Sequence, residues 1–582
     1  MHRNHHLLAP LIPNQNKRGG KAMARLIRLP VSAVLLIFLI TGIASPAANA
    51  QANDKGGGYW ISNDQAEKAE QQLKKGKSLE KYGEKQVQQK SDEGQKSLNE
   101  IQTEDRNAST SYESPMGPPV FTALGWEPPP FNYDHINTVE ECRRSPDSGS
   151  STGYIKNRYS FCWSHVATYQ VPRSCRFGIC SYDGVQIQFT EIGFGSNQSR
   201  KMRIYYSIDD IFVTNPSLNG AKLKIDFDCE AKINPGDCKP DPDTPPVERT
   251  IAQWKNVNYG LKTFLSDAPS PSDINPDQVG YMDFSPKLTI KHAPKKFTKT
   301  IEGIKQRVRF DSAKYMFAFP DQHFWQGAIF SRADPILNVP ITDPAFTPLK
   351  EAGEHWKFAM DHPEETKPYV LGKKIPGAVG KMPLTRMYTK RHPDEYAKNR
   401  NKTRAVCNKE FKDEDRTGKE CDEFPFASTW EGSAMNGQDW FSVRLISKES
   451  NNAAGRWLGA WYAYDRILDR DAFNVQVKAP VKVATISSYG TPKPGQDHRS
   501  SDNFEIGDIP AYANKLEWRI TSGPAGAKFD VMHDDSFGID ETIFNDLSEK
   551  SKTDIKKMKD LYIANPENTG GQEFTVEIYA IP

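Results

Sequence analysis

The chain has 582 residues, enough for about four domains. Lys and Arg number 76 and Asp and Glu 74, so the formal charge is +2, which excludes a histone-like polycation. The 8 cysteines are too few for a disulfide-scaffold protein, but their even number suits paired cysteines in an oxidising compartment.

The amino-terminal segment has the layout of a secretory signal peptide. Arg25 and Arg28 precede an apolar run over residues 31–43, and Ala48-Asn49-Ala50 follows as a small-residue cleavage site. The alternative is a membrane anchor, but a spanning helix needs about 20 apolar residues. We therefore predict that residues 1–50 are an extension and signal peptide cleaved after Ala50, and that the mature protein is secreted without stable membrane insertion.

Residues 51–115 are dominated by Gln, Lys, Glu, Ser and Gly. Their apolar residues, such as Leu73, Leu79 and Val87, are too sparse for a continuous stripe. This composition predicts a polar, disordered and partly helical linker. Prolines at 115, 118 and 119 mark its end.

An alternating pattern of apolar and polar residues begins after the prolines. Val185, Ile187 and Phe189 show it, and it recurs over residues 202–208 and 223–229. We predict a mostly antiparallel β-rich domain that, with a proline-rich connector, covers residues 116–380.

Six cysteines lie in this β-rich segment. Cys229 continues the apolar face of its strand, and Asn234-Pro235-Gly236 turns the chain back toward Cys238, which predicts a Cys229–Cys238 disulfide. Six cysteines allow 15 pairings, so the other pairs stay open. Zinc is the alternative, but no CxxC pair occurs.

Two histidines further along the chain are unsuited to one shared metal ion. His355 and His362 are seven residues apart, which on a helix is about 10 Å along the axis and too far for one ion. We expect both to be ordinary surface histidines.

Residues 381–478 have a distinct local order. A short helix is predicted over 392–401 and a short strand over 404–411, then an acidic loop, a strand over 440–447, and a helix capped by Asn451 or Asn452. Acidic loop, strand, asparagine turn and helix is the order of a ββα metal-nuclease site.

The polar residues of this segment suit phosphodiester hydrolysis. That reaction needs a base for water, a hard cation, and a group that holds the phosphate. Asp422, Glu423 and Glu431 supply carboxylates, Asn451 an amide oxygen and Arg444 a positive charge. Such hard ligands suit Mg²⁺ or Mn²⁺. On spacing alone, a solvated charged loop stays the alternative.

The motifs CDEFPFASTWEG and SVRLISKESNNAAGRWLG resemble the signature of the NucA/NucB-type deoxyribonucleases, which are secreted bacterial endonucleases. The resemblance covers about residues 382–477. It implies an α+β fold with a small ββα-metal-like nuclease core, in which an aspartate replaces the usual histidine base. Residues 479–582 would be an α+β carboxy-terminal extension of unknown role.

The resemblance also implies roles for single residues. Asp422 falls on the general base and Glu423 on the acidic position beside it. Glu431 and Asn451 fall on ligands of one Mg²⁺ or Mn²⁺ ion, and Arg444 on a position suited to phosphate binding or a structural ion pair.

Two departures from the family pattern concern cysteine and arginine. Cys421 stands where better-known members carry an arginine, and Cys407 matches a family cysteine whose usual partner is absent. The resemblance thus implies a Cys407–Cys421 disulfide. The missing arginine leaves three candidates for binding the substrate phosphate: Arg416, Lys419 and Arg456.

The predicted function is a secreted, metal-dependent endonuclease that hydrolyses DNA, and the choice between DNA and RNA stays open. One alternative is a non-catalytic extracellular DNA-binding or matrix protein. Another is the nuclease warhead of an antibacterial toxin, with an immunity or inhibitor protein as its partner. Residues 381–480 carry 18 basic and 15 acidic side chains, so binding to nucleic acid should be weak, salt-sensitive and helped by a cation.

Overall fold

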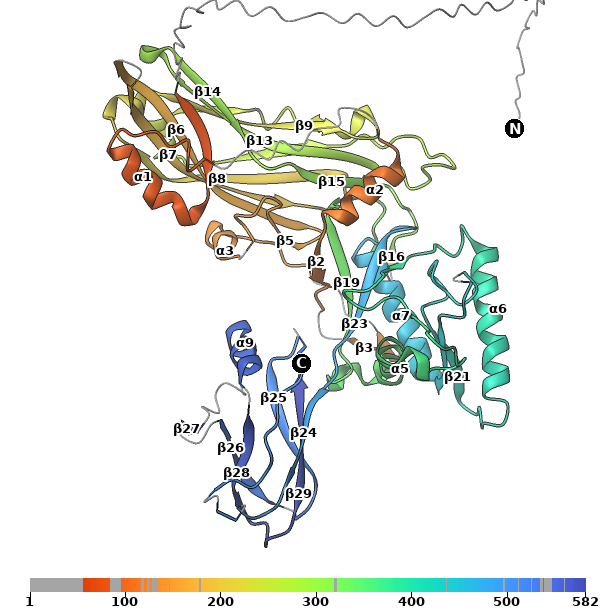
Figure 1. Cartoon of the computed structure of the whole chain (residues 1–582). Coiled ribbons are helices and arrows are strands. Elements are labelled where there is room, and N and C mark those ends of the chain that lie inside the picture. Colours follow the sequence, from red (N-terminus) through yellow and green to blue (C-terminus); the bar gives the residue numbers. More distant parts are fainter. Residues whose placement is uncertain are drawn as a thin grey trace, which may run out of the picture. The chain divides into compact units, whose positions relative to one another are not determined.

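The computed structural model describes residues 56–83, 96–116 and 120–582, except 123–124, 128–130, 132, 146, 177–178, 319–321, 436, 493, 496–497, 511, 525, 534–536, 539–546 and 559 (Figure 1). The described residues belong to one compact unit, Asp54–Pro582. None of the helices in this part of the chain is both long enough and apolar enough for a membrane span. The predicted signal peptide lies outside the described residues.

Two antiparallel sheets form the amino-terminal part. One has seven strands in the order β1-β6-β7-β8-β12-β10, with β5 paired to β6. Its strands are β1 (Gly57–Ile61), β5 (Tyr154–Asn157), β6 (Ser160–Arg176), β7 (Ile179–Phe194), β8 (Lys201–Val213), β10 (Lys239–Pro240) and β12 (Tyr259–Leu265).

The second sheet has six strands in the order β11-β9-β13-β15-β18, with β14 paired to β13. Its strands are β9 (Lys222–Ala231), β11 (Val247–Thr250), β13 (Gly280–His292), β14 (Phe297–Glu302), β15 (Gln306–Asp311) and β18 (Gly327–Phe330). Both sheets contribute to one hydrophobic cluster, which includes Trp163, Phe189, Phe227 and Phe284. The alternating pattern therefore predicted these antiparallel strands correctly.

Part of the predicted polar linker is folded. β1 pairs with β6, and α1 (Ala66–Lys74), α2 (Leu98–Asn107) and β2 (Thr110–Glu113) follow. Leu73 and Leu79 are fully buried against Val166 of β6. The prediction of a disordered linker is wrong for these elements, because the neighbouring sheet supplies the apolar surface that the linker itself lacks.

All eight cysteines are paired. The disulfides are Cys142–Cys162, Cys175–Cys180, Cys229–Cys238 and Cys407–Cys421. The second pair closes the β6–β7 hairpin, and the fourth joins α6 to β21, which are described below. Both predicted pairs, Cys229–Cys238 and Cys407–Cys421, are confirmed.

The segment with the predicted chemistry is built around a four-stranded sheet in the order β2-β19-β23-β20. Its further elements are β19 (Ala333–Val339), α5 (Lys350–Asp361), β20 (Leu384–Thr385), α6 (Pro393–Glu410), β21 (Lys419–Phe424), β22 (Ser442–Ser447), α7 (Lys448–Tyr464) and β23 (Ala472–Val477). β21 and β22 are antiparallel, and α7 follows β22 directly.

The hydrophobic core of this segment reaches further back in the chain than residue 381. Leu337 of β19 and Trp356 of α5 belong to the same buried cluster as Phe424, Trp457 and Phe473. Elements that we predicted as a connector are therefore part of this core.

Three local predictions in this segment are wrong. The strand expected over 404–411 belongs to helix α6, which buries Asn399, Thr403 and Cys407 at the four-residue spacing of one helix face. The expected acidic loop is strand β21. The asparagine cap is replaced by Ser447, whose side chain accepts the N–H of Ser450, so α7 begins before Asn451.

The carboxy-terminal residues contain two three-stranded sheets, one of β24, β29 and β25 and one of β27, β26 and β28. Their elements are β24 (Val481–Ser488), β25 (Lys515–Ser522), β26 (Lys528–His533), β27 (Phe537–Gly538), α9 (Glu549–Lys557), β28 (Leu561–Glu567) and β29 (Phe574–Ile581). The smaller elements elsewhere are β3 (Val120–Thr122), β4 (Gly125–Glu127), α3 (Val139–Arg144), α4 (Ile251–Trp254), β16 (Phe317–Ala318) and β17 (Gln322–His323). The fold is thus α+β, as predicted, and rich in antiparallel strands.

Candidate active site

A cleft of about 490 Å³ lies beside β21 and α7. It contains three of the predicted site residues, Asp422, Glu423 and Asn451. The other polar or aromatic side chains that line it are Trp356, Arg386, Tyr388, Thr389, Tyr396, Arg400, Phe426, Ser428, Asn452 and Tyr462. This is the part of the structure where the predicted chemistry comes together.

Asp422 is held on its buried side by helix α5. Its carboxylate is 6% exposed, and Oδ2 accepts a hydrogen bond from Trp356 Nε1 at 3.0 Å. His355 Nδ1 lies 2.7 Å from the same oxygen. Among the described residues, Oδ1 of Asp422 has no hydrogen-bond partner, so one carboxylate oxygen is anchored and the other is left for a molecule in the cleft.

The prediction of a surface histidine is wrong for His355. Its side chain is 1% exposed, and its Nε2 lies 2.7 Å from Ser442 Oγ. β21 and β22 bring these partners together, because Phe424 pairs with Ser442 and Asp422 with Arg444, so Asp422 and Ser442 share a face of the hairpin. A sequence signal existed: His355 falls on the apolar stripe of α5 with Ala352 and Ala359.

Glu423 points to the other neighbouring helix, α6. Its two carboxylate oxygens lie 3.0 and 3.1 Å from Arg400 Nη1. Burial raises the pKa of Glu423 to about 7, and the charge of Asp422 adds to this, although Arg400 opposes it. Glu423 therefore gains a proton near neutral pH, unlike an ordinary carboxylate.

Arg400 is a cleft residue that the sequence analysis missed. It lies in α6, one residue after the buried Asn399, and its guanidinium is the counter-ion of Glu423. The only sequence signal was indirect: a carboxylate on a strand that is buried on both faces requires a cation nearby.

Asn451 is a third predicted site residue that lines the cleft. Its Nδ2 donates to Glu420 Oε2 at 2.8 Å, which leaves Oδ1 as the group able to accept or to ligate a cation. An amide oxygen beside carboxylates is a donor set that suits Mg²⁺ or Mn²⁺, which retain several water ligands. The residues present therefore fit a hydrated hard cation.

Glu431, the second predicted metal ligand, lies outside the cleft that Asn451 lines. Its Oε2 accepts the N–H of Thr385 at 2.7 Å, and burial raises its pKa. In the part of the chain that the structure describes, no group of three or more His, Cys, Asp or Glu side chains is arranged to hold a metal ion.

The four remaining predicted cations do not line the cleft. Arg444, Lys419 and Arg456 are exposed on β22, β21 and α7. Arg416 is also exposed and donates to Asn408 Oδ1 at 2.7 Å. The arginines that line the cleft are instead Arg400, which binds Glu423, and Arg386, whose guanidinium lies 4.3 Å from the ring centroid of Tyr462.

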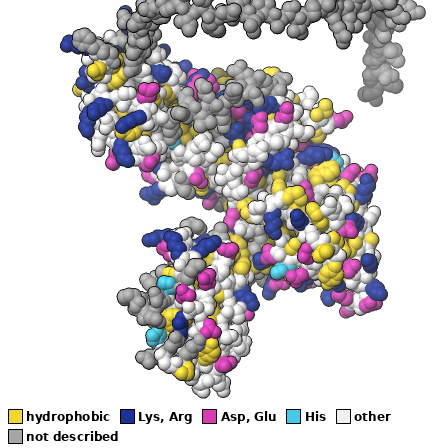
Figure 2. All heavy atoms as spheres, viewed as in Figure 1, with side chains coloured by type: hydrophobic (Ala, Val, Ile, Leu, Met, Phe, Trp, Pro, Cys, Tyr) yellow, Lys and Arg dark blue, Asp and Glu magenta, His cyan; other side chains and the backbone are white. Residues whose placement is uncertain are grey.

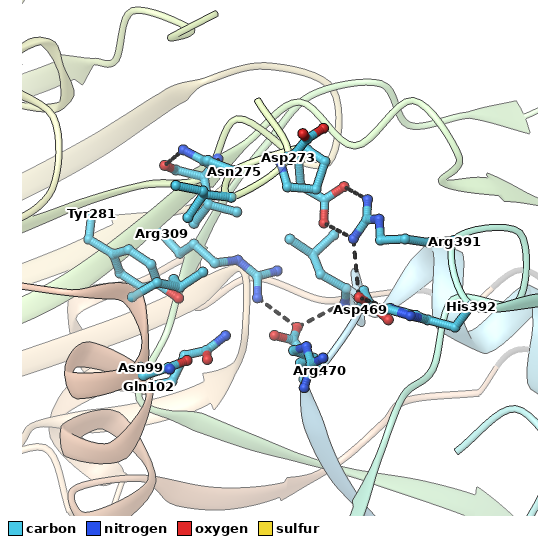
Figure 3. A pocket seen from close by; sticks show the side chains of 17 residues that line it. Asn99, Gln102, Asp273, Asn275, Tyr281, Arg309, Arg391, His392, Asp469 and Arg470 are labelled. Atoms are coloured by element: carbon cyan, nitrogen blue, oxygen red, sulfur yellow. Dashed lines mark hydrogen bonds and ion pairs between the residues drawn. The ribbon is translucent and has the colours of Figure 1, made fainter. Parts of the chain in front are cut away.

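A second, smaller cavity of about 190 Å³ lies near α2 and the residues that follow α7 (Figure 3). Several of its charged side chains pair with one another: Arg391 lies 2.8 Å from Asp277 and 3.2 Å from Asp469, and Arg309 lies 2.6 Å from Asp471. It contains none of the predicted site residues. The larger cleft is therefore the better candidate for an active site.

The comparisons with known proteins agree with this location. Residues 377–476 match the model of the family described as Deoxyribonuclease NucA/NucB. No curated protein and no solved structure matches the chain. The matched residues include Asp422, Glu423, Asn451 and Arg400, whereas His355 and Trp356 lie before them. Residues 377–476 are therefore a NucA/NucB-type deoxyribonuclease domain, whose substrate is a nucleic acid.

Proposed function

We propose that this protein is a secreted, metal-dependent endonuclease that hydrolyses DNA in the cleft beside β21 and α7. One observation carries the proposal: Asp422, Glu423 and Asn451 meet in one cleft inside the residues that match the nuclease family. Four disulfides support an oxidising compartment, as expected after cleavage of the predicted signal peptide. The order of β21, β22 and α7 supports a ββα-metal-like core.

In this mechanism Asp422 is the general base. Its Oδ1 takes a proton from the water that attacks phosphorus, while Oδ2 stays bound to α5. Arg400 and the protonated fraction of Glu423 keep the cleft from becoming too negative for a phosphodiester.

Asn451 is the residue of the cleft that would hold the cation through Oδ1. A bound Mg²⁺ or Mn²⁺ ion supplies charge stabilisation for the phosphate oxygens and the leaving oxygen. Glu431 remains a predicted ligand, although the structure uses its carboxylate to hold Thr385 at the start of the segment that leads to α6.

Cleavage of nucleic acid by the mature chain tests this proposal. Residues 51–582 should nick supercoiled plasmid DNA with Mg²⁺ or Mn²⁺ and should stop when EDTA is added. A parallel assay with single-stranded RNA decides whether RNA is also a substrate. Retention of DNA without scission, with or without EDTA, would instead support a non-catalytic DNA-binding protein.

A further inference from the structure

His355 stands outside the residues that match the nuclease family, yet it touches the proposed general base. It lies on α5, is 1% exposed, and does not line the cleft, whereas Asp422 does. His355 therefore acts on the cleft only through Asp422.

The hydrogen bonds show which group is the donor in the contact between His355 and Asp422. An ionised carboxylate only accepts, so the 2.7 Å contact requires a proton on His355 Nδ1. In a neutral ring Nε2 then accepts the hydroxyl proton of Ser442, 2.7 Å away. The ionised carboxylate thus selects the form of the ring that carries a proton on Nδ1, and the Ser442 hydroxyl, which can donate or accept, is the partner of Nε2.

Trp356, the next residue of α5, supplies a second donor to the same oxygen at 3.0 Å. Two donors from one helix hold Oδ2. This fixes the rotation of the carboxylate, so that Oδ1 has a defined direction in which to meet water.

We infer that His355 is a positioning residue for Asp422 and that α5, which precedes the family-matched residues, is part of the active site. The inference rests on the proposed nuclease function. Position matters because a small misplacement of a catalytic group can reduce a rate by about 100-fold.

Two substitutions separate positioning from packing. His355→Phe fills a similar volume but removes the donor, and His355→Asn retains an N–H close to the position of Nδ1. We expect kcat for plasmid nicking to fall about 100-fold in His355→Phe, with KM within about twofold, and to recover substantially in His355→Asn. His362→Phe is the matched control, because this histidine is 53% exposed at the end of the same helix and should leave kcat unchanged.

The inference is overturned if folded His355→Phe keeps the wild-type kcat, or if folded His355→Asn is no faster than His355→Phe. Thermal unfolding curves establish that the variants are folded.

A second readout does not depend on activity. The ¹⁵N spectrum of the wild-type imidazole should show a ring protonated at Nδ1, and Asp422→Asn should change that signal. A ring protonated only at Nε2 contradicts the inference even if the variants fail to fold. If the wild-type chain does not cleave DNA but the Nδ1–H form is observed, the proposed function fails while the pairing of His355 with Asp422 stands.

Discussion

At the scale of single residues, the buried carboxylates of β21 determine the character of the cleft. Asp422 and Glu423 are adjacent in sequence but point to different helices, and each is met by a partner, His355 or Arg400. Successive side chains of a strand point to opposite faces of the sheet. Asp422 can therefore act as a base while Arg400 holds Glu423 on the other face.

The raised pKa of Glu423 makes a prediction about stability. The pKa is about 7 in the folded protein against a reference value of 4.5, so the native state binds the extra proton between these pH values. The free energy of unfolding should therefore fall as pH rises through this window, by up to about 3 kcal/mol from this residue alone. Glu423→Gln, which resembles the protonated form, should remove that part of the pH dependence.

The measurement is urea unfolding at pH 5 and pH 8 for wild type, Glu423→Gln and Glu449→Gln. Glu449 is exposed in the first turn of α7, so its substitution should leave the difference between the two pH values as in wild type. An unchanged pH difference in Glu423→Gln would show that Glu423 is ionised throughout this window.

The residue types of the site were predictable, but their partners were not. Asp422, Glu423 and Asn451 stand in recognisable motifs, and all three line the cleft. His355 and Arg400 are separated from their partners by 67 and 23 residues, and no local pattern reports such a contact. Glu431 is the opposite case. Its motif was recognisable, but the motif did not reveal that its carboxylate accepts the Thr385 N–H.

At the scale of elements, β21 is held between two helices by different means. Hydrogen bonds from α5 anchor Asp422, and the Cys407–Cys421 disulfide ties α6 to the same strand. The position of the carboxylates therefore depends on both helices.

Removing this disulfide should destabilise the hairpin. The two cysteines are 14 residues apart, and closing a loop of this size stabilises a protein by about 3 kcal/mol. Cys407→Ala/Cys421→Ala should lower the free energy of unfolding by about that amount and reduce nicking activity. The control is Cys175→Ala/Cys180→Ala, which opens a bridge of only 5 residues at the exposed end of the β6–β7 hairpin.

Equal losses of activity in the two double variants would argue against a specific role of the Cys407–Cys421 tether in holding the site.

Strands in which apolar and polar residues alternate were predictable, because the alternation is visible within a few neighbouring residues of the sequence. The strands from β7 to β9 show this, as Val185, Ile187 and Phe189 are all buried. The helix predicted over 392–401 covers only the first half of α6, and its full length was not predictable, because its buried face carries Asn399, Thr403 and Cys407, which form no apolar stripe. Its contacts with the hairpin, rather than its own pattern, explain which face is buried.

At the scale of the whole molecule, the nuclease domain shares buried ion pairs with the amino-terminal sheets. Asp471, which precedes β23, lies 2.6 Å from Arg309 and 3.3 Å from Arg158. Arg466 Nε lies 2.7 Å from Asp311 of β15. A buried charge without such a partner lowers the stability of the fold. The nuclease domain and the amino-terminal sheets therefore depend on one another for stability.

The family-matched residues should therefore not fold alone. A fragment of residues 377–476 lacks β19, α5 and the partners of Asp471 and Arg466, and we expect it to show no cooperative unfolding transition and no nicking activity. Circular dichroism during heating checks this, with residues 51–582 as the folded reference. A cooperatively folded and active fragment would contradict the dependence on the rest of the chain.

The surface of the molecule agrees with the small net charge. On the face drawn in Figure 2, Lys and Arg side chains are interspersed with Asp and Glu side chains. No broad field of one sign attracts DNA to this face, so binding of DNA to it should be weak. The cleft and the proposed cation, rather than a basic surface, would then bind the scissile phosphate.

The most direct test of the central claim is the rate of plasmid nicking by Asp422→Asn compared with wild type, both as residues 51–582 with Mg²⁺. Asn keeps the shape of the side chain but cannot take a proton, so the account predicts a loss of at least about 100-fold in kcat. Asp413→Asn, which changes an exposed aspartate in the loop before β21, should cleave at the wild-type rate. Wild-type cleavage by a folded Asp422→Asn variant would contradict the assignment of the active site.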